Sequence, residues 1–124
     1  MSQYLPDVPE LLKTVQGYIR ELAAKSKGGD KYDALVAAYL LGICERELKN
    51  GPTIDAKEKE QLAKFLKSES SLEDLHKAIC AGIRNGDLDG QWDELLDMLL
   101  TQTVANVSVV RPDHLDDMHQ PGKQ

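Results

Sequence analysis

Two short stretches of the sequence contain residue types that could carry out chemistry. His76 and Cys80 stand four residues apart on an expected helix, where an imidazole can withdraw a proton from a thiol. Residues 85–90 resemble the start of a calcium loop, with oxygen-bearing side chains at alternate positions. Both patterns are incomplete, because no acidic residue is expected on the histidine's face and Leu96 replaces the bidentate glutamate of the loop. We therefore predict no catalytic residue and no metal site, and interpret the loop as a turn between helices.

The segment around Tyr39 offers another kind of site, one for a small molecule. Tyr39 lies in an otherwise aliphatic stretch, and a buried tyrosine needs a partner for its hydroxyl group. Gly42 would leave open space, and Arg46 could anchor a phosphate or a carboxylate. We predict these three residues as ligand-binding candidates and expect no cofactor. The alternative is structural: Arg46 would join two helix ends, and the tyrosine would reach the backbone of another helix or a buried water.

The elements that would position these residues are all helices. Apolar residues recur at helical spacing in five segments, and no stretch reads as a convincing strand. Residues 34–44 carry no charge, and a helix that is apolar all round is expected to be buried all round. Residues 50–52, Asn-Gly-Pro, indicate a helix stop, and Asp7 with Glu10 has the spacing of a capping box. The sequence predicts an all-α, single-domain bundle of about five helices around a central buried helix at about residues 31–50.

Length, composition and charge limit the classes of function. The chain has 124 residues, and we predict a helical domain over residues 1–112 and a polar, loose tail over residues 113–124. The formal net charge of -6 disfavours nucleic acid, which is itself anionic. The uncharged run is too short to cross a bilayer, so no membrane partner is expected.

The two cysteines bear on the cellular compartment. Cys44 and Cys80 both lie in apolar helical contexts, without a second cysteine close by. We interpret them as buried free thiols of a reducing compartment, and a disulfide between them is the alternative. The first ten residues lack the charged and apolar regions of a signal peptide. We therefore predict a cytoplasmic protein.

An exposed apolar strip is expected near the end of the bundle. Trp92, Val107 and Val110 fall on one face of the last helix. Five helices in a bundle of this size cannot hide every apolar stripe from water. We therefore predict these three residues as partner-binding candidates.

Three stretches of the sequence carry a family resemblance. Residues 36–52 (VAAYLLGICERELKNGP) resemble the Val-Ala-x-x-x-Leu-x-Ile-x-x-Arg-Glu-Leu-x-x-Gly-Pro pattern of a bacterial family of small helical proteins of unknown function. Residues 83–89 (IRNGDLD) are similar to the family's Ile-Arg-x-Gly-x-x-Asp pattern, and residues 99–107, leading to a proline, resemble its closing segment. The chain departs from the family at Tyr39, where an asparagine is expected, and at residues 107–110, where a more polar stretch is expected.

The resemblance implies a setting more than an activity. Members of this family are often encoded beside, or fused to, aminoglycoside-phosphotransferase-like kinases and acyl-CoA dehydrogenases. We therefore predict a non-enzymatic accessory or interaction module linked to acyl-CoA metabolism. Its partner would be an acyl-CoA dehydrogenase, a phosphotransferase-like protein or a second copy of the chain. The alternatives are a binding protein for an acyl-type small molecule, with a pocket beside the central helix, and an enzyme without a local motif.

Overall fold

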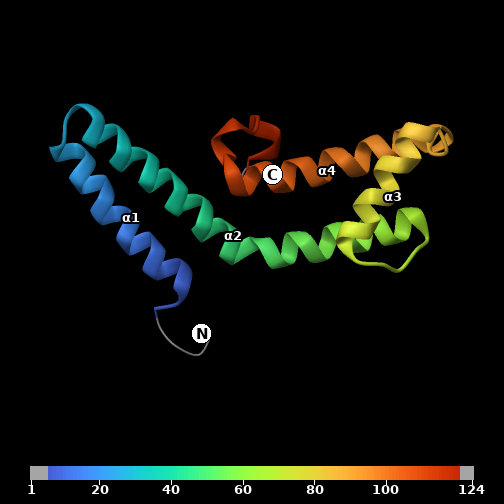
Figure 1. The fold of residues 1–124 in the computed structure, drawn as a ribbon, viewed down its shortest axis with the longest axis horizontal. Helices are drawn as coiled ribbons and strands as arrows, with labels where there is room; N and C mark the ends of the chain where they lie inside the picture. The colour runs from blue at the N-terminus through green and yellow to red at the C-terminus, as the bar shows by residue number, and fades with distance from the viewer. Residues whose placement is uncertain (1–5, 121–124) are drawn as a thin grey trace. The chain divides into compact units, whose positions relative to one another are not determined.

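The computed structural model describes residues 6–120, and within this range the chain forms helices and turns without a strand (Figure 1). This confirms the predicted all-α class. Residues 1–5, from the segment searched for a signal peptide, and residues 121–124, from the predicted tail, lie outside the described residues. The elements in chain order are α1 (Val8–Lys25), α2 (Gly28–Leu66), α3 (Leu72–Asn85), η1 (Asp89–Gln91), α4 (Trp92–Val110), η2 (Pro112–His114) and η3 (Asp117–His119).

The described residues contain four α-helices instead of about five, because α2 does not stop at residues 50–52. It continues for 39 residues with Pro52 inside it, so the predicted helix stop is wrong. A proline within a helix removes the hydrogen bond to the carbonyl four residues earlier, here that of Leu48. The helix that follows gains one backbone hydrogen bond per residue and buries Leu62 completely. These gains outweigh the local cost of the proline.

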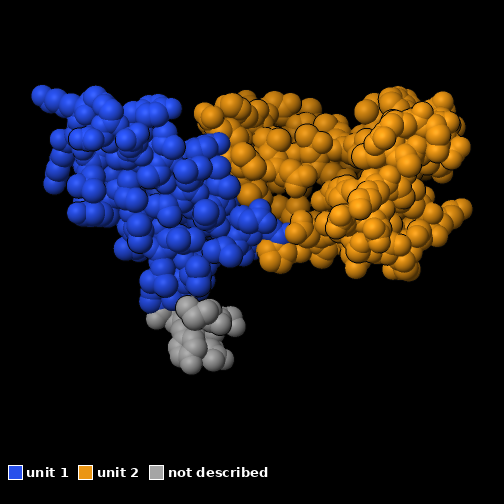
Figure 2. Space-filling view, in the orientation of Figure 1, with its two compact units in different colours: residues 1–51 blue, residues 52–124 orange. Residues whose placement is uncertain are grey.

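The chain divides into two compact units, Met1–Gly51 and Pro52–Gln124 (Figure 2). The boundary falls inside α2, immediately before its internal proline. Each unit therefore contains a different part of this helix, and the two units bury different kinds of side chain. We describe each of them separately below.

The first unit is an antiparallel hairpin of α1 and the N-terminal part of α2. The predicted capping box at the start of α1 is confirmed: Asp7 accepts from the backbone N–H of Glu10, and the Glu10 side chain accepts from that of Asp7. The helices meet through rows of buried or half-buried residues with helical spacing. These contact rows are Leu12, Gln16, Ile19 and Ala23 on α1, and Ala34, Ala38, Leu41 and Glu45 on α2.

The prediction that the central helix is buried all round is wrong for the described structure. Leu35 is 49% exposed and Leu40 is 53% exposed, and these two residues lie on opposite flanks of α2. Within the first unit, α1 covers only one side of α2, so the apolar residues on the other sides remain exposed. The sequence shows which residues of α2 are apolar, but it does not show which other helices cover them. No helix within residues 6–120 is long and apolar enough to span a membrane.

The second unit has a core of large aliphatic side chains. Leu62 of α2, Leu75 and Ile79 of α3, and Leu95 of α4 are each at most 4% exposed and pack together. Phe65, Met98, Leu99 and other partly buried residues pack against this cluster. The three helices are joined by short connections, and α4 runs beside the C-terminal part of α2 (Figure 1). This unit therefore satisfies its hydrophobic faces largely within itself.

The turns of the second unit use distinct end signals. Gly86 ends α3 with a φ of 84°, a left-handed conformation that glycine adopts readily. At the start of α3, the Ser71 side chain accepts from the backbone N–H of Asp74. Lys67 follows the end of α2 with a φ of 54°, and the next N–H bonds back to the carbonyl of Ala63. This is a left-handed helix cap, a position where glycine is usual.

We expect Lys67→Gly to stabilise the second unit, because glycine adopts a positive φ without the steric cost that a β-carbon causes. The gain should be about 0.5–1 kcal/mol in the free energy of unfolding measured by urea denaturation. Lys64→Gly is the matched control, since the same change within the last turn of α2 should cost about 0.5–1 kcal/mol. Equal effects of the two substitutions would contradict this account of the cap.

Candidate functional site

The predicted ligand-binding residue Gly42 lies at the closest contact within the hairpin. Gln16 is 9% exposed, and its Nε2 atom donates to the backbone carbonyl of Ala38 at 2.7 Å. In an α-helix that same carbonyl also accepts the backbone N–H of residue 42. A β-carbon added to Gly42 would lie only 2.9 Å from the Gln16 Nε2 atom. The missing side chain therefore gives the glutamine access to the second lone pair of the carbonyl.

Tyr39, Gly42 and Arg46 lie along one flank of α2, each one residue after a position of the contact row. Tyr39 is 38% exposed, and Arg46 is half-buried. An Arg46 guanidinium nitrogen lies 3.2 Å from the place of a β-carbon on Gly42. The space predicted for a ligand at the glycine is thus taken by the side chains of Gln16 and Arg46. Gly17 of α1 is not at a close approach, since a β-carbon there would meet nothing within 4 Å.

The partner-binding candidates belong to a row of apolar residues on the outside of α4. The structure divides the predicted stripe in two: Leu95 turns into the core, whereas Trp92 is 53% exposed and Leu96 is 55% exposed. The apolar residues recur at intervals of three, four or seven positions, so they follow one side of the helix. We call this set the α4 row; it consists of Trp92, Leu96, Leu100, Val107 and Val110. Val107 is half-buried, and the others are about half exposed.

The charges beside the α4 row are all negative. The helix contains Asp93, Glu94 and Asp97, but no lysine, arginine or histidine between residues 92 and 110. Helical spacing places Asp93 and Asp97 along the edge of the row, and Glu94 on the opposite side of the helix. The row is therefore an apolar surface with an acidic edge.

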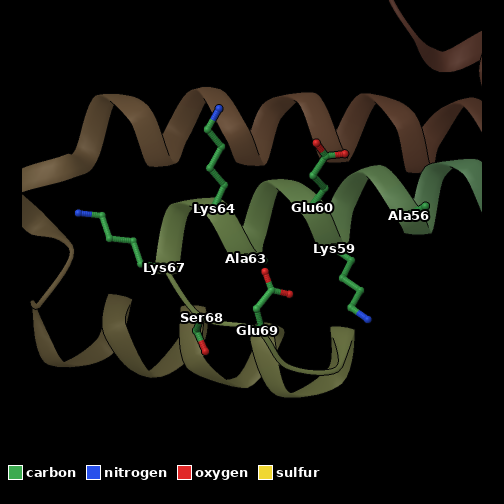
Figure 3. Close-up of a pocket in the computed structure, with 8 residues that line it drawn as sticks. All are labelled: Ala56, Lys59, Glu60, Ala63, Lys64, Lys67, Ser68 and Glu69. Carbon is green, nitrogen blue, oxygen red and sulfur yellow. The ribbon is translucent and has the colours of Figure 1, made fainter.

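An open cleft of about 660 Å³ lies where α2 ends and turns toward α3 (Figure 3). Lys59, Lys64 and Lys67 line it together with Glu60 and Glu69. Figure 3 shows the three ammonium groups pointing in different directions, so they do not converge on one anion. We interpret this cleft as a solvated end of a helix, where basic side chains favourably meet the negative end of the helix dipole.

Sequence reasoning missed an ion pair that involves His76. The Nε2 atom of His76 lies 3.0 Å from Oε1 of Glu58, a carboxylate that is only 8% exposed. No local spacing could have revealed this contact, because the two residues are 18 positions apart on different helices. The pair holds the imidazole against α2, which gives His76 a structural role. Cys80 and Cys44 are free thiols as predicted, but both are exposed, so their predicted burial is wrong.

The loop after α3 has a local explanation. The Asn85 side chain accepts from the backbone N–H of Asp87 at 2.9 Å, which closes a turn typical of asparagine. Within residues 6–120, no group of three or more histidine, cysteine or acidic side chains is arranged to hold a metal ion.

The fold and these surfaces define a small all-helical protein with two exposed apolar regions. The family described as Domain of unknown function (DUF6285) matches residues 24–114, most of the chain. The chain therefore belongs to this family, as the sequence resemblance to a family of unknown function implied. Comparisons with curated proteins and with solved structures gave no match.

We expect Gly42→Ala to be less favourable than the same change at Gly17. Both substitutions raise helix propensity by about 1 kcal/mol, but only the change at residue 42 displaces the buried Gln16 amide from its acceptor, at a cost of about 1–3 kcal/mol. The free energies of unfolding of the two variants should therefore differ by about 1–3 kcal/mol. Urea denaturation followed by circular dichroism measures the difference, and equal values would contradict the proposed role of Gly42.

We also expect His76→Ala to destabilise the second unit by about 1–2 kcal/mol, because it leaves the buried Glu58 carboxylate without its partner. The same change in a Glu58→Gln background should cost less, with a coupling energy of about 1 kcal/mol in a double-mutant cycle. Lys77→Ala is the control on the same helix. It removes an exposed pair with Glu73, at 3.2 Å, and should cost less than about 0.5 kcal/mol. A coupling energy near zero for the histidine pair would contradict this prediction.

Proposed function

We propose that the protein is a non-enzymatic interaction module, and that the α4 row binds a helical segment of a partner protein. The observation that carries this proposal is the exposure of Trp92, Leu96 and Leu100 on one side of α4, each more than half exposed. Contiguous apolar surfaces of this kind on small proteins mark sites of association. Tryptophan is also the residue type most enriched among the energetically dominant positions of interfaces.

The acidic edge specifies the chemistry of the partner. A helix that lays its apolar side on the α4 row would bring its flanking residues close to Asp93 and Asp97. Lysine or arginine at those flanks would be attracted, and aspartate or glutamate would be repelled. The partner segment is therefore an amphipathic helix with basic residues beside its apolar stripe, bound in the helix-to-helix mode common among peptide-recognition modules.

The family resemblance supplies the first proteins to test. It links such chains to acyl-CoA dehydrogenases and to aminoglycoside-phosphotransferase-like kinases, and we propose that one of these carries the partner segment. The free thiols of Cys44 and Cys80 suit the cytoplasm, where thiols stay reduced, and we place the complex there. A pocket for an acyl-type ligand has less support, since Gln16 and Arg46 occupy the space at Gly42.

Trp92 provides a direct readout, since it is the only tryptophan of the chain. We expect the fluorescence emission of Trp92 to shift to shorter wavelength when a purified acyl-CoA dehydrogenase or phosphotransferase-like kinase is added, because the indole leaves water on binding. The added protein should have no tryptophan near its binding segment, so that the shift reports on Trp92. Leu96→Ala should weaken binding about tenfold or more, as expected for a central interface position. An emission unchanged by either protein would contradict the proposed partners.

Charge substitutions at neighbouring positions test the geometry. Asp93→Lys should weaken binding about tenfold, because it places a positive charge at the edge of the α4 row. Glu94→Lys is the matched control, with the same change of charge one residue later but on the opposite side of α4. It should leave the affinity within about a factor of two. Equal losses from the two substitutions would mean that the partner binds elsewhere.

A further inference from the structure

The hairpin of α1 and α2 carries an apolar surface of its own, separate from the α4 row. On α1, the residues one position before each contact-row residue are large and apolar. They are Leu11, Val15, Tyr18 and Leu22, between 41% and 62% exposed. On α2 the equivalent positions include Leu40, at 53% exposure, and the exposed Cys44. We call these six residues the outer face.

The two rows of the outer face lie on the same side of the hairpin. In an antiparallel helix pair, a rotation of 180° about an axis perpendicular to the plane of the pair exchanges the two helices. Residues that stand one position before a contact-row residue, on either helix, therefore point to the same side of the hairpin. The hydrogen bond from Gln16 to Ala38 fixes the level at which the helices meet, and it places Val15 and Leu40 at nearly the same height. The outer face is thus one continuous surface.

The first unit buries few large side chains within itself. Its most buried side chains are small or polar, namely Ala23, Ala38 and Gln16. Its large aliphatic side chains are largely exposed, in contrast to Leu62 or Leu75 of the second unit. Five large side chains that are each about half exposed present on the order of 500 Å² of apolar surface, against ~800 Å² per partner in a standard interface.

We propose that the outer face binds the outer face of a second copy of the chain, and that the two hairpins form a four-helix bundle. The twofold axis runs parallel to the helices, so that α1 of each copy lies on α2 of the other. The bulky row with Val15 and Tyr18 then packs over the smaller row, in which Ala37 lies beside Leu40. Large side chains over small ones give the interdigitation that close helix packing needs.

Charge at the end of the outer face supports this arrangement over the other twofold alternative. Lys25 on α1 and Asp33 on α2 continue the two rows of the outer face. Both residues are exposed and lie near the connection between the helices. Neither forms an ion pair within the described part of its own chain. With the axis along the helices, Lys25 approaches Asp33 of the second copy, twice per dimer. With the axis across the helices at the level of Leu40, Asp33 would instead approach Glu47 of the second copy, which is repulsive.

Sedimentation of the full-length chain tests the proposal. The wild-type protein should have twice the mass of one chain at high concentration and dissociate on dilution. Leu40→Asp should raise the dimer dissociation constant at least about a hundredfold, because it places two carboxylates in the interface. Leu35→Asp is the matched control: Leu35 is 49% exposed but lies on the other flank of α2, and its dissociation constant should change by less than about threefold.

A charge exchange tests the pairing of the two copies. Lys25→Glu and Asp33→Lys should each weaken the dimer about fivefold, and the double variant should recover most of the loss. Circular dichroism checks that each variant keeps its helices. If Leu40→Asp loses its helical structure, Tyr18→Asp takes its place in the test. A chain that is monomeric at all concentrations overturns the proposal. So does equal weakening by the substitutions at residues 40 and 35, or a double charge variant no tighter than the single ones.

Discussion

The contact between α1 and α2 is close only because small side chains occupy its centre. Gln16 reaches the carbonyl of Ala38 over Gly42, where any side chain would stand in its way. The most buried members of the contact rows are Ala23, Ala38 and Gln16, whereas Leu12, Ile19 and Leu41 are half-buried there. Other large apolar residues of both helices lie on the flanks. Those on one side of the hairpin form its outer face.

The second unit differs from the hairpin in where its large apolar side chains lie. Leu62, Leu75 and Leu95 fill the space between three helices, so this unit has a core of large side chains. Its stability does not depend on a further partner in the way that the hairpin's does. The α4 row is therefore exposed apolar surface on a unit that already has a hydrophobic core. In physical terms, the outer face completes a fold, whereas the α4 row adds a binding surface to a fold that is already complete.

The sequence predicted features that depend on neighbouring residues. The all-α class, the capping box at Asp7 and the end of α3 at Gly86 follow from periodicity and end signals. Prediction from the sequence failed where contacts between distant parts of the chain determine the structure. Residues 50–52 are a strong local stop signal, yet the burial of Leu62 further on favours a continuous helix. The pair of Glu58 and His76 exists only because the fold brings α2 and α3 together.

The two apolar surfaces differ in the charges around them, and this difference separates their roles. A twofold interface places equivalent regions of two copies against each other, so its edge must be compatible with itself. The outer face meets this condition at the end near the connection between the helices, where one positive and one negative residue, Lys25 and Asp33, lie. The α4 row does not, because the charged residues that α4 itself places beside it, Asp93 and Asp97, are both acidic and acidic edges repel each other. This difference is why we propose self-association for the hairpin and a basic partner of a different kind for α4.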